Sequence, residues 1–369
     1  MSPASRKNFL AASGALAAST LAVSTLTSST PANAQTTGAV PEMPVLPPPD
    51  QKADADLKVV LQDLLSFNEP PLTSLEPQPA RELASFADAL RDVLSREGKP
   101  CVEPVAEIRH VVAMSPVGQL LMRVYKPAIR GPLPVVVYFH GGGFVIANLD
   151  TYDASPRSIA NAAKCIVISV AYHQAPEHPF PAAVEDAYFA YTWALQNAES
   201  LGGDPTKVAV AGESAGGNLA AVVANVARQR GSRPPVHQAL IYPVTEFGIV
   251  DTPSKKIYAD AFPLNTPDLQ YFGKLYLKKA SDPYSPLASP IRADLRGVAP
   301  ATIINAEIDP LRDDGLIYQQ ALQKADVPVT RTVYPGMTHE FFGMSAQVAK
   351  ARKARDEVAA ALKRAFGTR

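Results

Sequence analysis

The chain has 369 residues, 47% of them hydrophobic, which is enough to bury one large core or two smaller ones. Its 35 basic side chains are matched by 35 acidic ones, and no run of Lys and Arg forms a stripe that would bind a polyanion. Composition and charge therefore argue against nucleic acid as a partner.

The sequence contains two cysteines, Cys101 and Cys165. Two cysteines without histidines at ligand spacing do not form a metal-binding pattern. Cys165 lies in an apolar run, so we expect it to be buried as a small hydrophobic residue. The spacing leaves open whether the two cysteines form a disulfide.

The first 34 residues have the features of an export signal. Arg6 and Lys7 precede a mildly apolar stretch, and Ala32-Asn33-Ala34 forms a small-x-small cleavage sequence. The start also resembles a twin-arginine motif in which Lys7 replaces the second arginine, so the twin-arginine and general secretory routes both stay open. We expect residues 1–34 to be a signal peptide that directs the chain to the periplasm or the medium. The stretch is too rich in Ala, Ser and Thr to be a stable membrane anchor.

A proline-rich linker at residues 35–52 is expected to be extended. Two helical patterns follow at 53–66 and 80–96, and the second has apolar side chains along one face. We therefore divide the rest of the chain into an N-terminal helical segment, 53–100, and a main domain, 101–369.

From about residue 105, short apolar strands alternate with helices. Strands at 108–114 and 120–125 are joined by a turn at Gly118 and predict an antiparallel edge. Further strands are expected at 134–139, 166–171, 208–211, 239–242, 302–305 and 329–333, and helices at 154–163, 182–198, 215–230, 315–325 and 348–366. Continuous apolar strands separated by helices are typical of an α/β fold with a mainly parallel sheet and helices on both faces.

Residues 245–292 interrupt this alternation, because they are rich in proline and aromatic residues and contain one short helical pattern at 268–278. An insertion at this place projects above the carboxyl ends of the strands, where ligands bind in open α/β sheets. We expect the insertion and the helices of residues 53–100 to form a cap over a pocket. A surface excursion that contacts no substrate is the alternative.

One serine lies in the run Gly212-Glu213-Ser214-Ala215-Gly216-Gly217, between an apolar strand and an apolar helix. This context is that of a nucleophile elbow, whose sharp turn tolerates only small neighbours. The helix that begins there directs its amides and positive dipole end at the reacting centre. The pattern predicts Ser214 as a nucleophile.

The run His140-Gly141-Gly142-Gly143 follows the strand at 134–139. Glycines leave backbone N–H groups open to a substrate oxygen, and acyl transfer needs such donors because the carbonyl oxygen becomes an oxyanion. We expect an oxyanion hole formed by the N–H of Ala215 and that of Gly142, Gly143 or Gly141.

The base must be one of six histidines. With a serine at such an elbow, the chain order is serine, acid, histidine. Four histidines precede Ser214 and are set aside: His110, His140, His173 and His178. His237 opens a strand, which favours a structural role, whereas His339 follows the strand at 329–333 and precedes the last helix. We predict that His339 is the base.

The acid is expected after the strand at 302–305. Glu307 and Asp309 both lie there, and Pro310 fixes the turn just beyond Asp309. Asp313 and Asp314 fit the first turn of a helix better. We predict that Asp309 holds the imidazole, with Glu307 as the alternative.

The motifs together resemble the hormone-sensitive-lipase-like family of bacterial esterases. The resemblance covers roughly residues 100–365 and rests on four ordered segments: the HGGG loop at 140–143, GESAGG at 212–217, DPLRD at 309–313 and the histidine loop at 336–341. It implies an α/β-hydrolase fold with a helical cap. The sequence departs from the family pattern at Glu213, at Tyr172-His173-Gln174, and at Glu340, where a glycine is common.

The resemblance also implies an activity. We expect hydrolysis of short- to medium-chain acyl esters, acetyl esters among them, through a Ser-His-Asp triad and an acyl-enzyme, with no metal or organic cofactor. An amidase or formamidase with the same triad is one alternative, and a non-catalytic ligand-binding relative is another, although the retained His339 argues against it. The expected partner is a small-molecule ester, and the last helix with its neighbouring strand offers a surface for a homodimer.

Overall fold

The structure of the chain is a computed structural model. It describes residues 46–48, 50–248 and 251–368. The expected signal peptide, residues 1–34, and most of the proline-rich linker, residues 35–52, lie outside the described residues.

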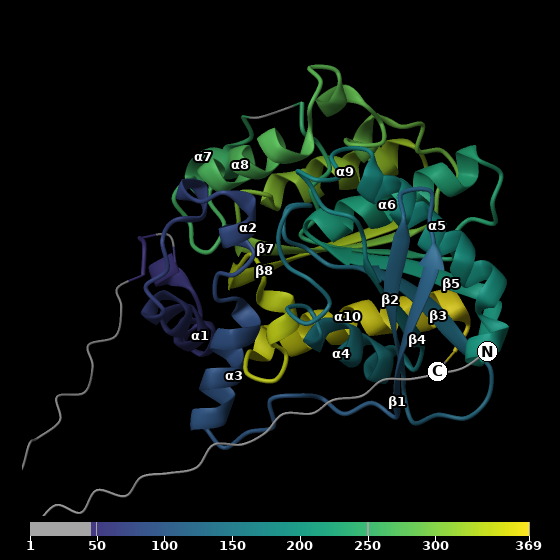
Figure 1. Cartoon of the computed structure of the whole chain (residues 1–369), viewed down its shortest axis with the longest axis horizontal. Coiled ribbons are helices and arrows are strands. Elements are labelled where there is room, and N and C mark those ends of the chain that lie inside the picture. The colour runs from purple at the N-terminus through teal and green to yellow at the C-terminus, as the bar shows by residue number, and fades with distance from the viewer. Residues whose placement is uncertain (1–45, 49, 249–250, 369) are drawn as a thin grey trace, which may run out of the picture. The chain divides into compact units, whose positions relative to one another are not determined.

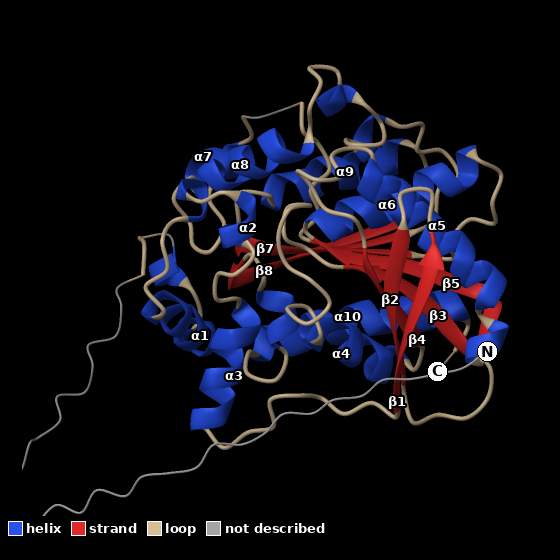
Figure 2. Ribbon diagram, in the orientation of Figure 1, coloured by secondary structure: helices blue, strands red, loops and turns tan. Residues whose placement is uncertain are grey.

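Eight strands of the described chain form one sheet in the order β1-β2-β4-β3-β5-β6-β7-β8 (Figure 2). Their bounds are β1 Glu107–Met114, β2 Gln119–Lys126, β3 Leu133–Phe139, β4 Ile166–Ala171, β5 Gly203–Glu213, β6 Gln238–Ile241, β7 Ala301–Ile308 and β8 Val329–Thr338. β1 and β2 are antiparallel, β2 is also antiparallel to β4, and every other pair is parallel. The predicted mainly parallel α/β sheet with an antiparallel edge is confirmed.

Helices cover both faces of the sheet (Figures 1 and 2). One face carries α5 (Ala182–Asn197), α6 (Ala215–Gln229) and α9 (Arg312–Lys324), and the other carries α4 (Ala154–Ala163) and α10 (Ala349–Phe366). Each face of the sheet has its own hydrophobic core: the first core lies under α5, α6 and α9, and the second under α4 and α10. Successive residues of β3 point to opposite sides, so Val135 and Val137 join the first core while Val136 and Tyr138 join the second. Burial on both faces explains why the strands are continuously apolar.

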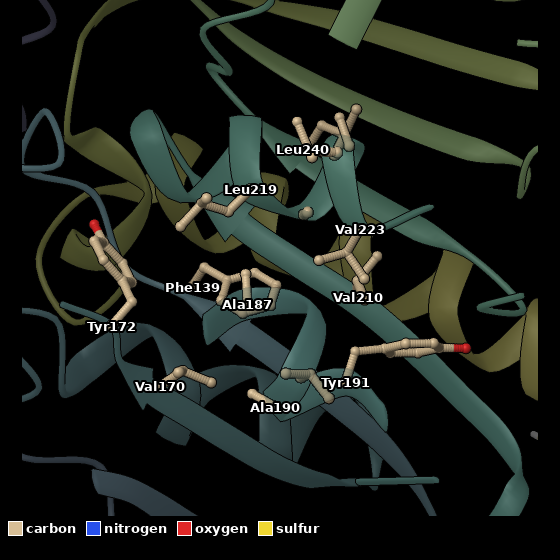
Figure 3. Packing of buried hydrophobic residues seen from close by; sticks show 14 of the residues in the cluster. Phe139, Val170, Tyr172, Ala187, Ala190, Tyr191, Val210, Leu219, Val223 and Leu240 are labelled. Atoms are coloured by element: carbon tan, nitrogen blue, oxygen red, sulfur yellow. The ribbon is translucent and has the colours of Figure 1, made fainter. Parts of the chain in front are cut away.

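Helix α6 packs in the centre of the first core. Its residues 215–227 are all buried, which is possible because they are small or apolar apart from Asn218 and Asn225, whose side-chain amides donate to backbone carbonyls. Leu219 and Val223 lie close to the sheet and to α5, where Ala187 leaves room for them (Figure 3). Full burial of a side chain such as Leu219 stabilises the fold by about 1.5–3 kcal/mol. The helix that follows Ser214 is therefore rigidly fixed.

The predicted helix at 80–96 is wrong at its start. The chain instead forms a short helix, α2 (Pro77–Ala80), and a second one, α3 (Phe86–Arg96). The break has a local cause, because the Asp88 carboxylate accepts the Ser85 N–H at 2.8 Å and so caps a new helix start. The predicted helix at 53–66 is confirmed as α1 (Ala55–Ser66).

The insertion at 245–292 is anchored to the start of α9. It contains α7 (Pro253–Ile257) and α8 (Thr266–Tyr276). The Asp314 carboxylate accepts the Thr245 N–H at 3.0 Å, and the Asp313 carboxylate accepts the Ser254 N–H at 2.8 Å. The two acids expected in the first turn of this helix do lie there, and they also hold the insertion in place.

The segment before residue 100 touches this insertion at two points. The Phe262 N–H donates to the Asp50 carboxylate at 2.8 Å, and the Tyr271 hydroxyl donates to the Leu75 carbonyl at 3.2 Å. The described residues all belong to one compact unit. The division into a cap and a catalytic domain therefore stays a prediction.

Two further features concern the described residues only. No helix there is long and apolar enough to cross a membrane. Cys101 is exposed and Cys165 is buried, and both are free thiols, so the disulfide that the spacing left open is not formed.

Arg81 ties the N-terminal segment to the loop that follows β3. Its Nε donates to the Val145 carbonyl at 2.8 Å, and one terminal nitrogen donates to the Ala175 carbonyl at 2.9 Å. Both terminal nitrogens also meet the Glu177 carboxylate, at 2.9 and 2.6 Å. Because a guanidinium presents several donors in one plane, a single side chain holds three separate segments together.

We expect Arg81→Met to lower the free energy of unfolding by about 2–3 kcal/mol, because two backbone carbonyls lose a charged donor. Urea denaturation followed by circular dichroism measures the change. The matched variant Glu177→Gln should cost less than about 1 kcal/mol, because its side chain is 53% exposed and water competes for the pair. Equal losses in the two variants would contradict the conclusion that Arg81 holds the three segments together through the backbone carbonyls.

Candidate active site

Ser214 lies at the turn between β5 and α6 in a strained backbone conformation. Its φ of 55° and ψ of −116° are unusual for a residue with a side chain. The turn requires glycine nearby, since a Cβ on Gly216 would overlap the carbonyl oxygen of Phe139. The Ser214 N–H donates to the Ile241 carbonyl at 2.9 Å, which fixes the turn against β6. This is the geometry that the G-x-S-x-G pattern predicts.

The structure brings the three predicted triad residues into one hydrogen-bonded chain. The distance from Ser214 Oγ to His339 Nε2 is 2.9 Å, and that from His339 Nδ1 to Asp309 Oδ2 is 2.8 Å. A carboxylate can only accept, so Nδ1 carries the proton and Nε2 is free to accept the serine hydroxyl. Asp309 is fully buried, and Ser214 is only 6% exposed.

The charges around His339 favour its protonated form. Burial by itself lowers the pKa of the imidazole, but the Asp309 carboxylate, with smaller contributions from Glu340 and Glu213, raises the net pKa above the usual 6.5. His140, in contrast, is buried without such a partner, and its pKa falls to about 4. His140 also stacks on the ring of Tyr172, with centroids 4.4 Å apart.

Geometry separates the two candidate acids. Asp309 follows β7, and its second oxygen accepts the Leu311 N–H at 2.7 Å, which fixes the carboxylate toward the imidazole. Glu307 points elsewhere and accepts the Gly336 N–H at 2.7 Å. Between Ala306 and Ile308 the register with β8 shifts, so Glu307 holds a bulge in the strand that leads to His339.

The predicted loop before His339 differs in the structure. β8 continues through Pro335 and Gly336 to Thr338, so His339 follows the strand directly. Gly336 has a φ of 68°, which lets the strand bend and resume its pairing. The bulge explains why a proline and a glycine at this place do not end the strand.

The glycine loop after β3 faces the elbow. Gly142 and Gly143 have φ values of 94° and 60°, and the Gly142 carbonyl accepts the N–H groups of Val145 and Ile146 in a tight turn. In the part of the chain that the structure describes, no protein oxygen accepts the N–H of Gly142, Gly143 or Ala215. These three donors are free for a ligand oxygen. The Gly141 carbonyl accepts the Tyr172 hydroxyl at 3.1 Å, which holds the start of the loop.

Aromatic side chains of the insertion lie over this loop. A Cβ on Gly143 would overlap the ring of Phe272 from α8. The ring of Phe144 stacks on Tyr276 with centroids 3.9 Å apart, and Phe247 packs against both. The insertion thus packs apolar rings beside the glycine loop.

Two carboxylates next to the triad, the buried Glu213 and the partly exposed Glu340, were not predicted as site residues. Glu213 accepts hydroxyl groups from Tyr138, at 2.6 Å, and from Tyr242. Burial and the charge of Glu340 raise the pKa of Glu213 to about 7. The available signal was that Glu213 and Glu340 both stand where the sequence departs from the family pattern. Their contacts come from residues far away in the sequence.

The other departure, His173, contacts a different acid. Its Nδ1 lies 2.6 Å from the Asp186 carboxylate, which also accepts its N–H and the Ser115 hydroxyl. His237 lies 3.0 Å from the Thr302 hydroxyl, in keeping with the structural role expected for it. Within the described residues, no three His, Cys, Asp or Glu side chains gather as ligands for a metal ion.

The sequence matches a family of known fold. A family model described as an α/β-hydrolase fold matches residues 136–343. The chain is 44% identical over 250 residues to the carboxylesterase NlhH of Mycobacterium tuberculosis, which covers 66% of this chain and 78% of that protein. It is 37% identical over 246 residues to an arylesterase of Saccharolobus solfataricus, covering 65% and 79% of the two chains. It is also 37% identical over 237 residues to an ethyl acetate hydrolase of Pseudomonas putida, covering 63% and 74%.

Solved structures agree with these similarities. An esterase of Pyrobaculum calidifontis superposes with a TM-score of 0.75 at 38% identity, covering 82% of this chain and 97% of that one. The metagenomic carboxylesterase EstE1 gives a TM-score of 0.74 at 38% identity, covering 79% and 98%. These likenesses extend over most of the described residues.

We expect Asp309→Asn to slow covalent labelling of Ser214 by a fluorophosphonate by on the order of 10⁴, because an amide at this place favours the wrong imidazole tautomer. The matched control is Glu307→Gln, whose side chain contacts the β8 bulge and not the imidazole, so its labelling rate should stay within a few-fold. Intact-protein mass spectrometry over time gives both rates. The reverse order would make Glu307 the acid.

Proposed function

Because the chain belongs to the α/β-hydrolase fold family that matches residues 136–343, we propose that it is a serine carboxylester hydrolase acting on short- to medium-chain acyl esters. The observation that carries the proposal is the hydrogen-bonded chain from Ser214 through His339 to Asp309. Relatives that are carboxylesterases, an arylesterase and an ethyl acetate hydrolase support the same class of bond.

The first half of the reaction transfers the acyl group to Ser214. His339 Nε2 takes the hydroxyl proton as Oγ bonds to the carbonyl carbon, and the carbonyl oxygen becomes an oxyanion. The N–H of Ala215 and an N–H of the glycine loop, from Gly142, Gly143 or Gly141, donate to this oxyanion. The carbon–oxygen bond to the alcohol then breaks, and the alcohol leaves with the proton from Nε2.

The second half returns the enzyme to its starting state. Water gives one proton to His339 Nε2 while its oxygen bonds to the acyl carbon, and the same donors stabilise the second oxyanion. The bond from the acyl carbon to Oγ breaks, and the proton on Nε2 returns to Ser214. Asp309 accepts the Nδ1–H throughout and stabilises the imidazolium in both halves.

The room around the glycine loop favours small acyl groups. Phe272 lies directly on Gly143, and Phe144, Tyr276 and Phe247 form one packed aromatic group beside it. A long acyl chain would have to displace rings that are packed against one another. Acetyl to hexanoyl groups need less space, which is why we propose short- to medium-chain esters.

The test is a series of p-nitrophenyl esters from acetyl to palmitoyl with the purified protein. We expect kcat/KM to be largest at the short end and to fall steeply for long chains, while Ser214→Ala loses on the order of 10⁴–10⁶ in kcat. A matched anilide of the best acyl group separates an esterase from an amidase or formamidase, since faster amide turnover would overturn the proposal. A protein that neither labels nor turns over any acyl compound would be the non-catalytic relative.

We also infer that the protein is exported and processed. The features that support this are Arg6, Lys7 and the sequence Ala32-Asn33-Ala34, which lie outside the described residues. Protein recovered from the periplasm or medium should begin at Gln35, and intact mass and N-terminal sequencing check this. A protein that keeps residues 1–34 and stays in the cytoplasm contradicts it.

A homodimer stays a prediction. β8 lies at one edge of the sheet and pairs with β7, and α10 packs beside both strands. An edge strand offers backbone donors and acceptors to a second copy, so this surface is where we expect two copies to meet.

A further inference from the structure

Glu340 lies beside the nitrogen of His339 that faces the serine. Its Oε1 is 3.7 Å from His339 Nε2, the atom that is 2.9 Å from Ser214 Oγ. The backbone of Glu340 has a φ of 69°, in the left-handed region, at the turn between β8 and Phe341. His339 therefore has a carboxylate near each ring nitrogen, Asp309 at Nδ1 and Glu340 at Nε2.

Tyr152 fixes the carboxylate of Glu340. The Tyr152 hydroxyl donates to Glu340 Oε1 at 2.6 Å, from a position 188 residues earlier in the chain. The same hydroxyl lies under the start of the glycine loop, since a Cβ on Gly141 would overlap it. Glu340 thus lies between the imidazole of His339 and the hydroxyl of Tyr152, which contacts the start of the glycine loop.

The other titratable groups that face this cluster come from several elements. Asp309 follows β7, Glu213 ends β5, Tyr138 belongs to β3, and the Tyr242 ring lies 4.4 Å from that of His339. His140 lies 5.8 Å from the Tyr152 ring, measured between centroids. In the described chain, no Lys or Arg pairs with Glu213 or Glu340. The imidazole of His339 is the group next to Glu340 that can become positively charged, and it does so only when Nε2 takes a proton.

We propose that Glu340, held by Tyr152, is a second positioning carboxylate that stabilises the protonated His339 in both halves of the reaction. The role rests on the proposed function, because it acts through the proton that Nε2 takes from Ser214 and later from water. A negative charge within about 4–6 Å of an imidazole favours the charged ring. Glu340 does not touch the acyl group and acts on the reaction through His339.

The sign of the pH effect follows from this geometry. The base must be neutral in the free enzyme, so kcat/KM falls as the pH falls through the pKa of His339. Glu340 contributes to raising that pKa above its usual value. Removing its charge should therefore extend activity to lower pH and reduce the rate at high pH. Burial raises the pKa of Glu340, while the His339 imidazole and the Tyr152 hydroxyl favour its ionised form.

The test compares Glu340→Gln with the wild type across pH 5–9, as kcat/KM for the best ester and, separately, as the rate of fluorophosphonate labelling. The isosteric amide can still accept the Tyr152 hydroxyl but carries no charge. We expect the acid midpoint to fall by about one pH unit, and the rate at high pH to fall by up to about tenfold. A matched control is Glu357→Gln, because Glu357 also accepts a tyrosine hydroxyl, that of Tyr334 at 2.8 Å, but contacts no triad residue. It should leave the midpoint unchanged.

Tyr152→Phe distinguishes a positioned charge from simple packing. Without the hydroxyl, Glu340 loses the hydrogen bond that favours its ionised form, so the midpoint should fall by less than in Glu340→Gln. The double variant should shift no further than Glu340→Gln alone. An unchanged or raised midpoint in a folded Glu340→Gln protein would overturn the proposal. Labelling that shifts as expected in a protein that hydrolyses no ester would leave the role of Glu340 intact and overturn the proposed function.

Discussion

The close approach of the first turn of α6 to the end of β3 is the constraint on which the site depends. A side chain at Gly216 would overlap the Phe139 carbonyl, so the two backbones pack directly on each other. This contact places Ser214 in its strained conformation and aims the N–H of Ala215 at the space in front of it. It also brings the elbow beside the glycine loop, because that loop begins where β3 ends. The strain is offset by the burial of the whole of α6 in the first core.

Carboxylates next to the triad are stabilised here by phenol hydroxyls and not by cations. Tyr138 and Tyr242 donate to Glu213, and Tyr152 donates to Glu340. A hydroxyl satisfies a buried oxygen without adding a charge, so the field at His339 remains negative. A lysine or arginine in the same place would neutralise that field and lower the pKa of the imidazole. The tyrosines therefore satisfy oxygens of both acids without placing a positive charge beside the histidine.

The sequence predicted the sheet, its helices and the members of the triad, because these depend on local patterns. An apolar strand, a run of small residues and an apolar helix identify an elbow within a few positions of Ser214. The sequence favoured Asp309 over Glu307 through Pro310, but it could not show that β7 extends to Ile308, so that Glu307 lies within the strand and its carboxylate accepts the Gly336 N–H of the β8 bulge. The helix at 80–96 was misplaced because the cap formed by Ser85 and Asp88 competes with a continuous apolar face. Contacts such as Tyr152 with Glu340 join residues too far apart for any pattern to reveal.

The distance along the chain between the elbow and the histidine has a consequence for folding. Ser214 and His339 are 125 residues apart, and the strands that position them are separated by β6, β7 and the whole insertion. A chain with the elbow formed but β8 still unpaired would carry a serine with no base, and such a serine is a weak nucleophile. The nucleophile is therefore activated only when β5 and β8 are both in place in the sheet. Any opening of the sheet that releases β8 would separate Ser214 from His339 and so switch off the nucleophile without altering the elbow itself.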